Sequence, residues 1–167
     1  MVRLLLVVVS FLGCARPSGR IRIAASTTLI GTIVQTVGGD RFAVTTIAPA
    51  GLCPGQFDLK PSDITAANQA RLLLNHGWEG WFPRLEKAMW TADTRKVTLA
   101  TKGNWMIPDV QKRATAEIAA LLMELDSARA DTYRLASESY QARVDSAAAT
   151  ARTMLAGKTL PAVIAAE

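Results

Sequence analysis

The sequence has little of what a catalytic site needs, because its 167 residues include one histidine and only two cysteines. A hydrolase would pair a nucleophile with a base, and Cys53 with His76 is the one conceivable pair. The Gly-x-Ser-x-Gly turn that presents a nucleophilic serine is absent. We therefore predict that the protein is not an enzyme; loss of a hydrolytic activity on alkylation of Cys53 would revive that alternative.

A basic stripe is also missing. The formal net charge is +5, but the 19 lysines and arginines are scattered and are not interleaved with aromatic residues. This pattern argues against nucleic-acid binding. The positive charge favours, weakly, anionic neighbours such as a membrane surface or an anionic ligand. With 50% apolar and 20% charged residues, the chain is expected to fold as one globular domain of ordinary size.

Long hydrophobic runs are absent too, and the one apolar segment near the N-terminus is too short for a stable membrane anchor. The stretch "MVRLLLVVVSFLGC" has Arg3, an apolar core over residues 4–9, and small residues ending at Gly13. This layout is typical of a secretory signal peptide, which we place over residues 1–14.

The ending "FLGC" resembles a bacterial lipoprotein box, with Phe11 where leucine is usual. The resemblance implies that Cys14 becomes the lipid-modified first residue of the mature chain, followed by a flexible tether over residues 15–20. An ordinary signal peptide with an incidental cysteine is the alternative. Export would place Cys53 in an oxidising compartment without a partner, so this thiol is buried, reactive or a ligand.

Strand and helix patterns alternate between residues 21 and 108, which we predict to be an N-terminal α/β lobe. Apolar, β-branched runs predict strands over 21–26, 42–49, 70–77 and 96–100. Helical spacing or capping residues predict helices over 27–39, 61–69 and 78–90. Gly38 and Gly39 read as a stop signal for the first of these helices. Such alternation favours a parallel sheet with helices on both faces.

The pattern changes after residue 108. Residues 109–157 are predicted to form a long connecting helix, with a polar hinge or short irregularity over 126–131 and one apolar stripe along 133–155. Residues 158–167 begin a fifth strand pattern, which we interpret as the start of a truncated second lobe; an edge strand that finishes the domain is the alternative.

Polar side chains follow each predicted strand. They are Ser26, Thr27 and Thr28 after the first, Cys53, Gln56 and Asp58 after the second, Asn75 and His76 with Glu79 after the third, and Asn104 with Trp105 after the fourth. In an open parallel sheet, ligands bind beyond the carboxyl ends of the strands. We therefore expect these groups to gather at a shared cleft.

Several segments carry a resemblance to a known family. They are "RIAASTTLIGTIVQTVGGDRFAVTTIAPAG", "CPGQFDLKPSDI", "NHGWEGWF" and "GNWMIPDVQKRATAEIAALLMELDSARADTY". In this order they resemble the zinc/manganese class of substrate-binding proteins of ABC importers. The resemblance covers nearly all of residues 22–167 and implies the first lobe of a two-lobed solute-binding protein plus a stiff helical spine.

The resemblance also marks two departures, because the family's first two metal-ligand histidines align with Gly55 and Gly103. Gln56 and Asn104 follow one residue later and are candidate replacements, although amide oxygens suit Zn²⁺ poorly. Cys53 and His76 are the soft or borderline ligands near the site, and two such residues are too few to close it. Glu167 lies close to where the resemblance places a third ligand.

The candidate metal ligands are therefore Cys53, Gln56, His76 and Asn104, with Zn²⁺ or Mn²⁺ as the transported ion. Ser26, Thr27, Thr28 and Asp58 are candidates for supporting the ligands or for binding an anion, because helix N-termini favour anions. An oxyanion or another small solute is the alternative ligand. Each candidate also has a purely structural interpretation: a buried thiol for Cys53, a hydrogen bond to a neighbouring loop for His76, turn-stabilising amides, and helix caps.

The predicted function follows from the resemblance. The protein captures a metal ion at the cell surface, without a chemical step, and delivers it to an ABC permease in the membrane. The expected location is outside the cytoplasm, with a lipid anchor at Cys14, and the expected state is a monomer.

Overall fold

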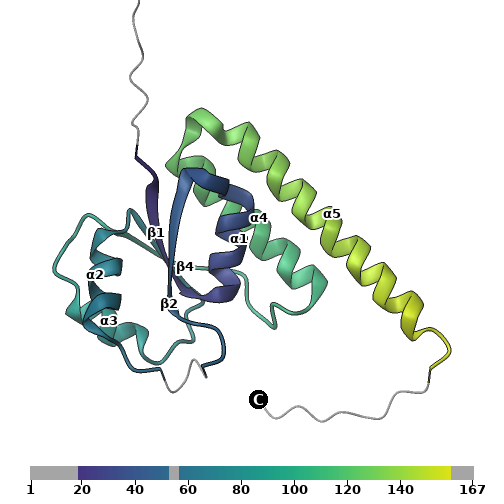
Figure 1. Ribbon diagram of the computed structural model, residues 1–167, viewed down its shortest axis with the longest axis horizontal. Helices are drawn as coiled ribbons and strands as arrows, with labels where there is room; N and C mark the ends of the chain where they lie inside the picture. Colours follow the sequence, from purple (N-terminus) through teal and green to yellow (C-terminus); the bar gives the residue numbers. More distant parts are fainter. Residues whose placement is uncertain (1–18, 53–56, 159–167) are drawn as a thin grey trace, which may run out of the picture.

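The computed structural model describes residues 19–52 and 57–158. Its four strands are β1 (Ile21–Thr27), β2 (Phe42–Ala48), β3 (Leu72–Asn75) and β4 (Arg95–Thr98). Its α-helices are α1 (Thr28–Gly38), α2 (Pro61–Gln69), α3 (Phe82–Ala88), α4 (Pro108–Leu125) and α5 (Ala130–Leu155). Two short 3₁₀ turns, η1 (Gly39–Arg41) and η3 (Ser127–Arg129), complete the order shown in Figure 1.

The strands form one parallel sheet in the order β2-β1-β3-β4. Ile23 of β1 is in register with Val44 of β2 and with Leu72 of β3. Successive side chains of a strand point to opposite faces, and both faces of β1 and β3 are covered. Such burial explains why these strands read as continuous apolar runs.

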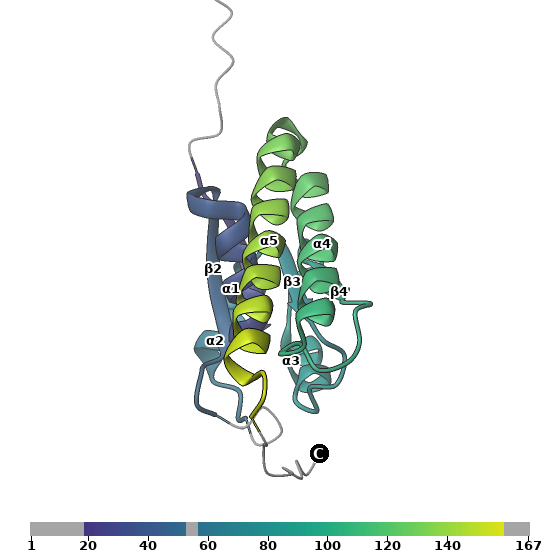
Figure 2. The same ribbon diagram turned by 90° about the vertical axis from the view of Figure 1, so that its right-hand side faces the viewer.

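Two hydrophobic cores lie on the two faces of the sheet. Ile23 and Ala25 of β1 pack with residues of α1, α4 and α5. Ala24, between them in the strand, packs with residues of α2 and α3. Figure 2 shows α1, α4 and α5 together on one side of the sheet. The predicted fold class, a parallel sheet with helices on both faces followed by a long helix, is therefore confirmed.

Helix α3 is shorter than the predicted 78–90 and begins at Phe82. The reason lies in the preceding turn, where the backbone N–H groups of residues 76–78 are bound by the carboxylate of Glu79. A backbone held in that way does not enter a helix until the turn is complete. Pro83 then lies in the first helical turn, where its missing N–H costs nothing.

Residues 109–157 contain two helices, and the chain reverses between α4 and α5, which lie side by side (Figures 1 and 2). The reversal occurs at Asp126, inside the predicted hinge. Its carboxylate accepts hydrogen bonds from Arg41 Nε at 2.9 Å and Tyr133 Oη at 2.8 Å. These contacts tie the turn to η1 and to the first turn of α5, so the hinge is fixed to the lobe.

The apolar stripe predicted along α5 is buried only in its first half. Tyr133 is buried, and Ala136 and Tyr140 pack against the core. Met154 and Leu155 are exposed, where α5 extends past the lobe in Figure 1. The predicted fifth strand lies in residues 159–167, outside the described residues. In the part of the chain that is described, no helix is both long and apolar enough to cross a membrane.

Candidate functional site

Of the five buried polar residues at the carboxyl ends of β1 and β3, four meet one another: Ser26, Thr27, His76 and Glu79. We call these four the strand-end cluster. The fifth, Asn75, forms its side-chain hydrogen bonds with β4 instead. The four meet because β1 and β3 are neighbours in the sheet, although Thr27 and His76 are 49 positions apart in the sequence. The first two residues end β1, and the other two follow β3. This convergence agrees with the general position of ligand sites in open parallel sheets.

Glu79 holds the turn after β3 in place. Its carboxylate accepts a hydrogen bond from Ser26 Oγ on the neighbouring strand end. It also accepts from the backbone N–H groups of His76 and Gly77, both at 2.9 Å, and of Trp78 at 3.2 Å. Gly77 has φ +89°, which a residue with a side chain rarely adopts. The buried carboxylate and the glycine together fix where His76 lies.

The imidazole of His76 is enclosed and only partly satisfied. Its Nε2 lies 2.9 Å from Thr27 Oγ1, while its Nδ1 is buried without a hydrogen-bond partner among the described residues. The ring of Trp78 stacks on it with centroids 5.1 Å apart, and Trp105 meets it edge-on at 4.4 Å. An unpaired buried polar atom is costly, so Nδ1 marks a place where a ligand atom would be favourable.

Burial lowers the pKa of His76 below its ordinary value of 6.5; the carboxylate of Glu79 opposes this shift and the ammonium group of Lys102 adds to it. The imidazole is therefore neutral near pH 7, which is the form that binds metal ions. Lys102 also donates to the carbonyl oxygens of His76 and Leu99, both at 3.0 Å, and so ties the loop after β4 to the strand-end cluster.

We expect this lowered pKa to appear in the pH dependence of stability. Below about pH 6.5 the unfolded chain binds a proton at His76 while the folded chain does not, so the free energy of unfolding falls as the pH falls from 7.5 to 5.5. Because His76 is the only histidine, urea unfolding of His76→Gln should show a weaker pH dependence than the original chain. Equal slopes would contradict the lowered pKa.

Three other predicted site residues, Asn104, Asp58 and Thr28, lie outside the strand-end cluster. Asn104 is exposed, and its Oδ1 accepts from the backbone N–H of Met106 at 2.9 Å, which stabilises its own turn. Asp58 is exposed and lies 3.9 Å from Arg84. Thr28 opens α1 and is half-buried. Thr27 precedes it as the N-cap but makes no side-chain capping bond, because its hydroxyl is engaged with His76.

Cys14, Cys53 and Gln56 lie outside the described residues. The loop after β2 and the loop after β4 were expected to meet, but the residues of these loops that the structure describes pack in different cores. Phe57 packs edge-on against Trp81 at 5.2 Å in the core shared with α2 and α3. Trp105 packs in the core on the other face of the sheet and against His76. The shared cleft over all four strand ends therefore stays a prediction.

Glu79 was expected among the polar groups at the strand ends but was not named as a ligand or supporting residue, and the role of Lys102 was missed. For Glu79 the sequence does carry a local signal, because a carboxylate two residues after a glycine can reach back to the N–H groups of the turn. No sequence signal marks Lys102, whose contacts join two separate loops. Among residues 19–52 and 57–158, no three His, Cys, Asp or Glu side chains lie close enough together to hold a metal ion.

The known proteins that this chain resembles agree with the family model that matches it. The family model described as "ZnuA: Zinc-uptake complex component A periplasmic" matches residues 23–165. The metal ABC transporter substrate-binding lipoprotein SsaB of Streptococcus sanguinis is 27% identical over 96 residues, which are 50% of this chain and 31% of that protein. The iron-binding protein YfeA of Yersinia pestis is 25% identical over 142 residues, 75% of this chain and 46% of that protein.

Solved structures share the fold. A crystal structure of ZnuA aligns with a TM-score of 0.74 at 21% identity, covering 83% of this chain and 60% of that one. The Mn-bound periplasmic metal binding protein of Candidatus Liberibacter asiaticus aligns with a TM-score of 0.71 at 20% identity, covering 80% of this chain and 56% of that one. The chain thus spans less than two thirds of the length of each of these proteins.

Proposed function

Because the chain belongs to the family of the periplasmic zinc-uptake complex component A, we propose that it captures a divalent metal ion outside the cytoplasm and delivers it to an ABC permease. In this proposal the described lobe is the first of two, and Cys14 carries the lipid that holds the protein at the membrane. Capture requires no chemical step, so the site has only to bind and release its ion.

The observation that carries the proposal is the Nδ1 of His76 at the carboxyl edge of the sheet, which is buried and has no hydrogen-bond partner within the described part of the chain. If the Nε2–H group donates to Thr27, Nδ1 presents a lone pair to a metal ion. Metal-bound imidazoles commonly donate their other N–H to a neighbouring oxygen in this way. Trp78, which covers the ring, is 56% exposed, so a single side chain separates His76 from solvent on that side.

The proposed ligand set is Cys53, Gln56, His76 and Asn104, with Zn²⁺ or Mn²⁺ as the ion. A thiolate and an imidazole favour Zn²⁺, whereas amide oxygens favour harder ions such as Mn²⁺. Asn104 must give up its bond to the N–H of Met106, or share that oxygen, to serve as a ligand. The strand-end residues Ser26 and Thr27 then support the site through Glu79 and His76.

The oxyanion alternative is less well supported. It needs free hydroxyl groups at the start of α1, yet two of the three candidates, Ser26 and Thr27, are already bound to Glu79 and His76, which leaves only the hydroxyl of Thr28. The buried carboxylate of Glu79 beside them would also repel an anion. The relatives named above are described by metal ions and by metal transport.

Titration calorimetry with Zn²⁺, Mn²⁺ and molybdate tests the proposal on the full chain carrying Cys14→Ser, which removes the second thiol. We expect one of the two metals to bind, and Cys53→Ser or His76→Gln to weaken binding about tenfold or more. Quenching of tryptophan fluorescence should accompany binding, since Trp78 and Trp105 contact His76. Circular dichroism confirms that each variant is folded. Binding of molybdate without binding of either metal would overturn the proposal.

A further inference from the structure

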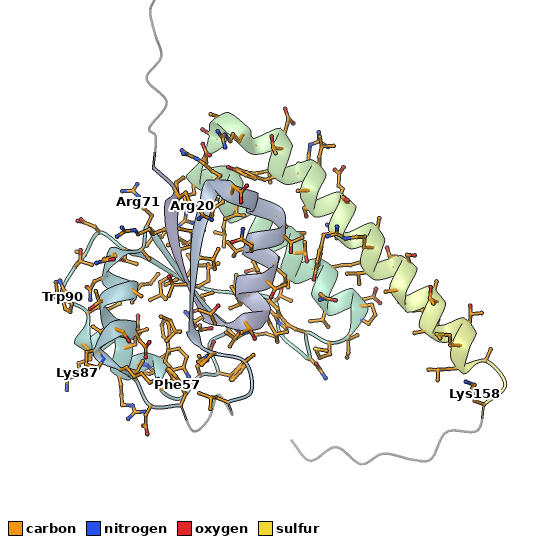
Figure 3. The ribbon with its side chains drawn as sticks, viewed as in Figure 1. Arg20, Phe57, Arg71, Lys87, Trp90 and Lys158 are labelled. Carbon is orange, nitrogen blue, oxygen red and sulfur yellow. The ribbon has the colours of Figure 1, made fainter. Side chains whose placement is uncertain are left out.

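The amino ends of the strands form the opposite edge of the sheet, and arginines gather there. Arg20 and Arg22 lie at the start of β1, Arg41 immediately precedes β2, and Arg71 immediately precedes β3. Figure 3 shows Arg20 and Arg71 close together at this edge, and Phe57 and Lys87 at the other. The carboxyl ends carry the strand-end cluster, so the lobe is basic at one edge of its sheet and carries its candidate site at the other.

These arginines line a single hollow of about 640 Å³, together with Gly19, Ile21, Gln69, Leu125 and Asp126. We call it the arginine hollow. Four guanidinium groups face one carboxylate, that of Asp126, so the lining keeps an excess of positive charge. Four of the 19 basic residues are therefore gathered in one place, because a parallel sheet brings the residues before its strands to one edge.

Arg20 and Arg22 are held in position by hydrogen bonds that use only some of their N–H donors. Arg20 donates to the carbonyl oxygens of Asp40 at 3.1 Å and Phe42 at 3.0 Å, and Arg22 donates to Gln69 Oε1 at 2.8 Å. Each guanidinium has five N–H donors. Arg71 is exposed, and its side chain makes no hydrogen bond or ion pair within residues 19–52 and 57–158. Preorganised guanidinium groups with spare donors suit phosphate oxygens.

We propose that the arginine hollow binds the phosphate of an anionic phospholipid headgroup and so orients the lobe on the membrane. The inference rests on the proposed lipidation of Cys14. Five residues lie between Cys14 and Arg20, and each of the six steps from one residue to the next spans at most about 3.5 Å, so the tether reaches about 20 Å. The lipid anchor thus keeps the hollow within about that distance of the headgroups.

This orientation has a consequence for the candidate site. Strand β1 has seven residues, and the six steps between its first and last residues, at about 3.3 Å each, separate its two ends by about 20 Å. A lobe resting on its basic edge holds the strand-end cluster away from the bilayer and open to ions in solution. Attraction between arginines and anionic lipids is screened by salt, so the contact is reversible and leaves the lobe free to turn toward a permease.

Vesicle sedimentation tests the proposal with the full chain carrying Cys14→Ser, so that no lipid is attached. The leader is present in every variant, and only differences between variants and vesicles are interpreted. We expect vesicles containing phosphatidylglycerol to bind the protein more tightly than vesicles of phosphatidylcholine alone. Arg22→Gln with Arg71→Gln should weaken this binding about 25-fold, since each arginine near an anionic surface contributes about a fivefold factor. Salt at about 0.5 M should also weaken it.

The control is Lys87→Gln with Lys158→Gln, which removes two charges at exposed positions away from the hollow. It should leave vesicle binding within about twofold. Equal binding to both kinds of vesicle, or equal loss in the control, would overturn the proposal. So would tight binding of inorganic phosphate to the hollow without binding to vesicles, which would indicate a soluble anion. Metal affinity should be unchanged in the arginine variant, so failure here is separate from failure of the proposed metal capture.

Discussion

Replacing Glu79 with alanine is expected to reduce the free energy of unfolding by about 3–5 kcal/mol, because one buried carboxylate serves four donors and its loss leaves each of them without an acceptor. The donors are Ser26 Oγ and the backbone N–H groups of His76, Gly77 and Trp78. Glu79→Gln keeps the shape of the side chain but turns an NH₂ group toward N–H donors, and should cost about 2 kcal/mol. Urea unfolding measures both values.

Glu86→Gln is the matched control. Glu86 belongs to α3 and lies 3.2 Å from Lys96, but both side chains are well exposed. Exposed ion pairs contribute about 0–1 kcal/mol, so this variant should unfold within about 0.5 kcal/mol of the original chain. If Glu79→Ala were as mild as Glu86→Gln, the carboxylate would not organise the turn.

The same substitution should disturb the candidate site. Glu79 fixes the backbone of His76, whose ring is the only imidazole in the chain and gives a single pair of NMR signals. We expect these signals to shift and broaden in Glu79→Gln while they are unchanged in Glu86→Gln. Metal affinity should fall in the first variant even where it is folded, because the ring is no longer held at the strand end.

Much of the fold could be predicted from the sequence because its signals are local. The strands read as apolar, β-branched runs, and the buried positions of β3, Leu72 to Leu74, leave little room for another interpretation. The helices follow from spacing and from breaks. The start of α3 was placed too early because the carboxylate of Glu79 holds the preceding turn in another conformation.

The site was harder to predict because its contacts cross the sheet. Ser26 and Thr27 look like caps for α1, and nothing in the sequence says that β1 lies beside β3. Because the two strands are neighbours, the hydroxyl of Ser26 bonds to Glu79 and the hydroxyl of Thr27 to His76. The turn around Asn104, in contrast, follows from local chemistry, since asparagine side chains often bond a backbone N–H two residues on.

The close packing around Gly38 could likewise not be predicted from the sequence. With Gly39 it reads as a stop signal for α1, and Gly39, with φ +57°, does form the C-cap. Gly38 itself serves another purpose. A Cβ built there would lie 2.9 Å from Phe42 Cε2, still closer to Phe42 Cδ2, and 3.3 Å from Leu122 Cδ1. The close approach of α1 to the start of β2 and to α4 is a property of the folded chain that periodicity does not reveal.

We therefore expect Gly38→Ala to destabilise the protein by about 2–3 kcal/mol, although alanine favours a helix by up to about 1 kcal/mol over glycine. The ring of Phe42 is fully buried and packs against Tyr133 of α5, with centroids 5.5 Å apart, so it has little room to move. A displaced ring should also loosen α5, which faster hydrogen exchange in its first turns would reveal. Gly80→Ala, where a Cβ meets nothing within 4 Å, should change the free energy of unfolding by less than about 0.5 kcal/mol. Equal effects of the two substitutions would mean that α1 and the α4–α5 hairpin do not depend on this contact for their position against the sheet.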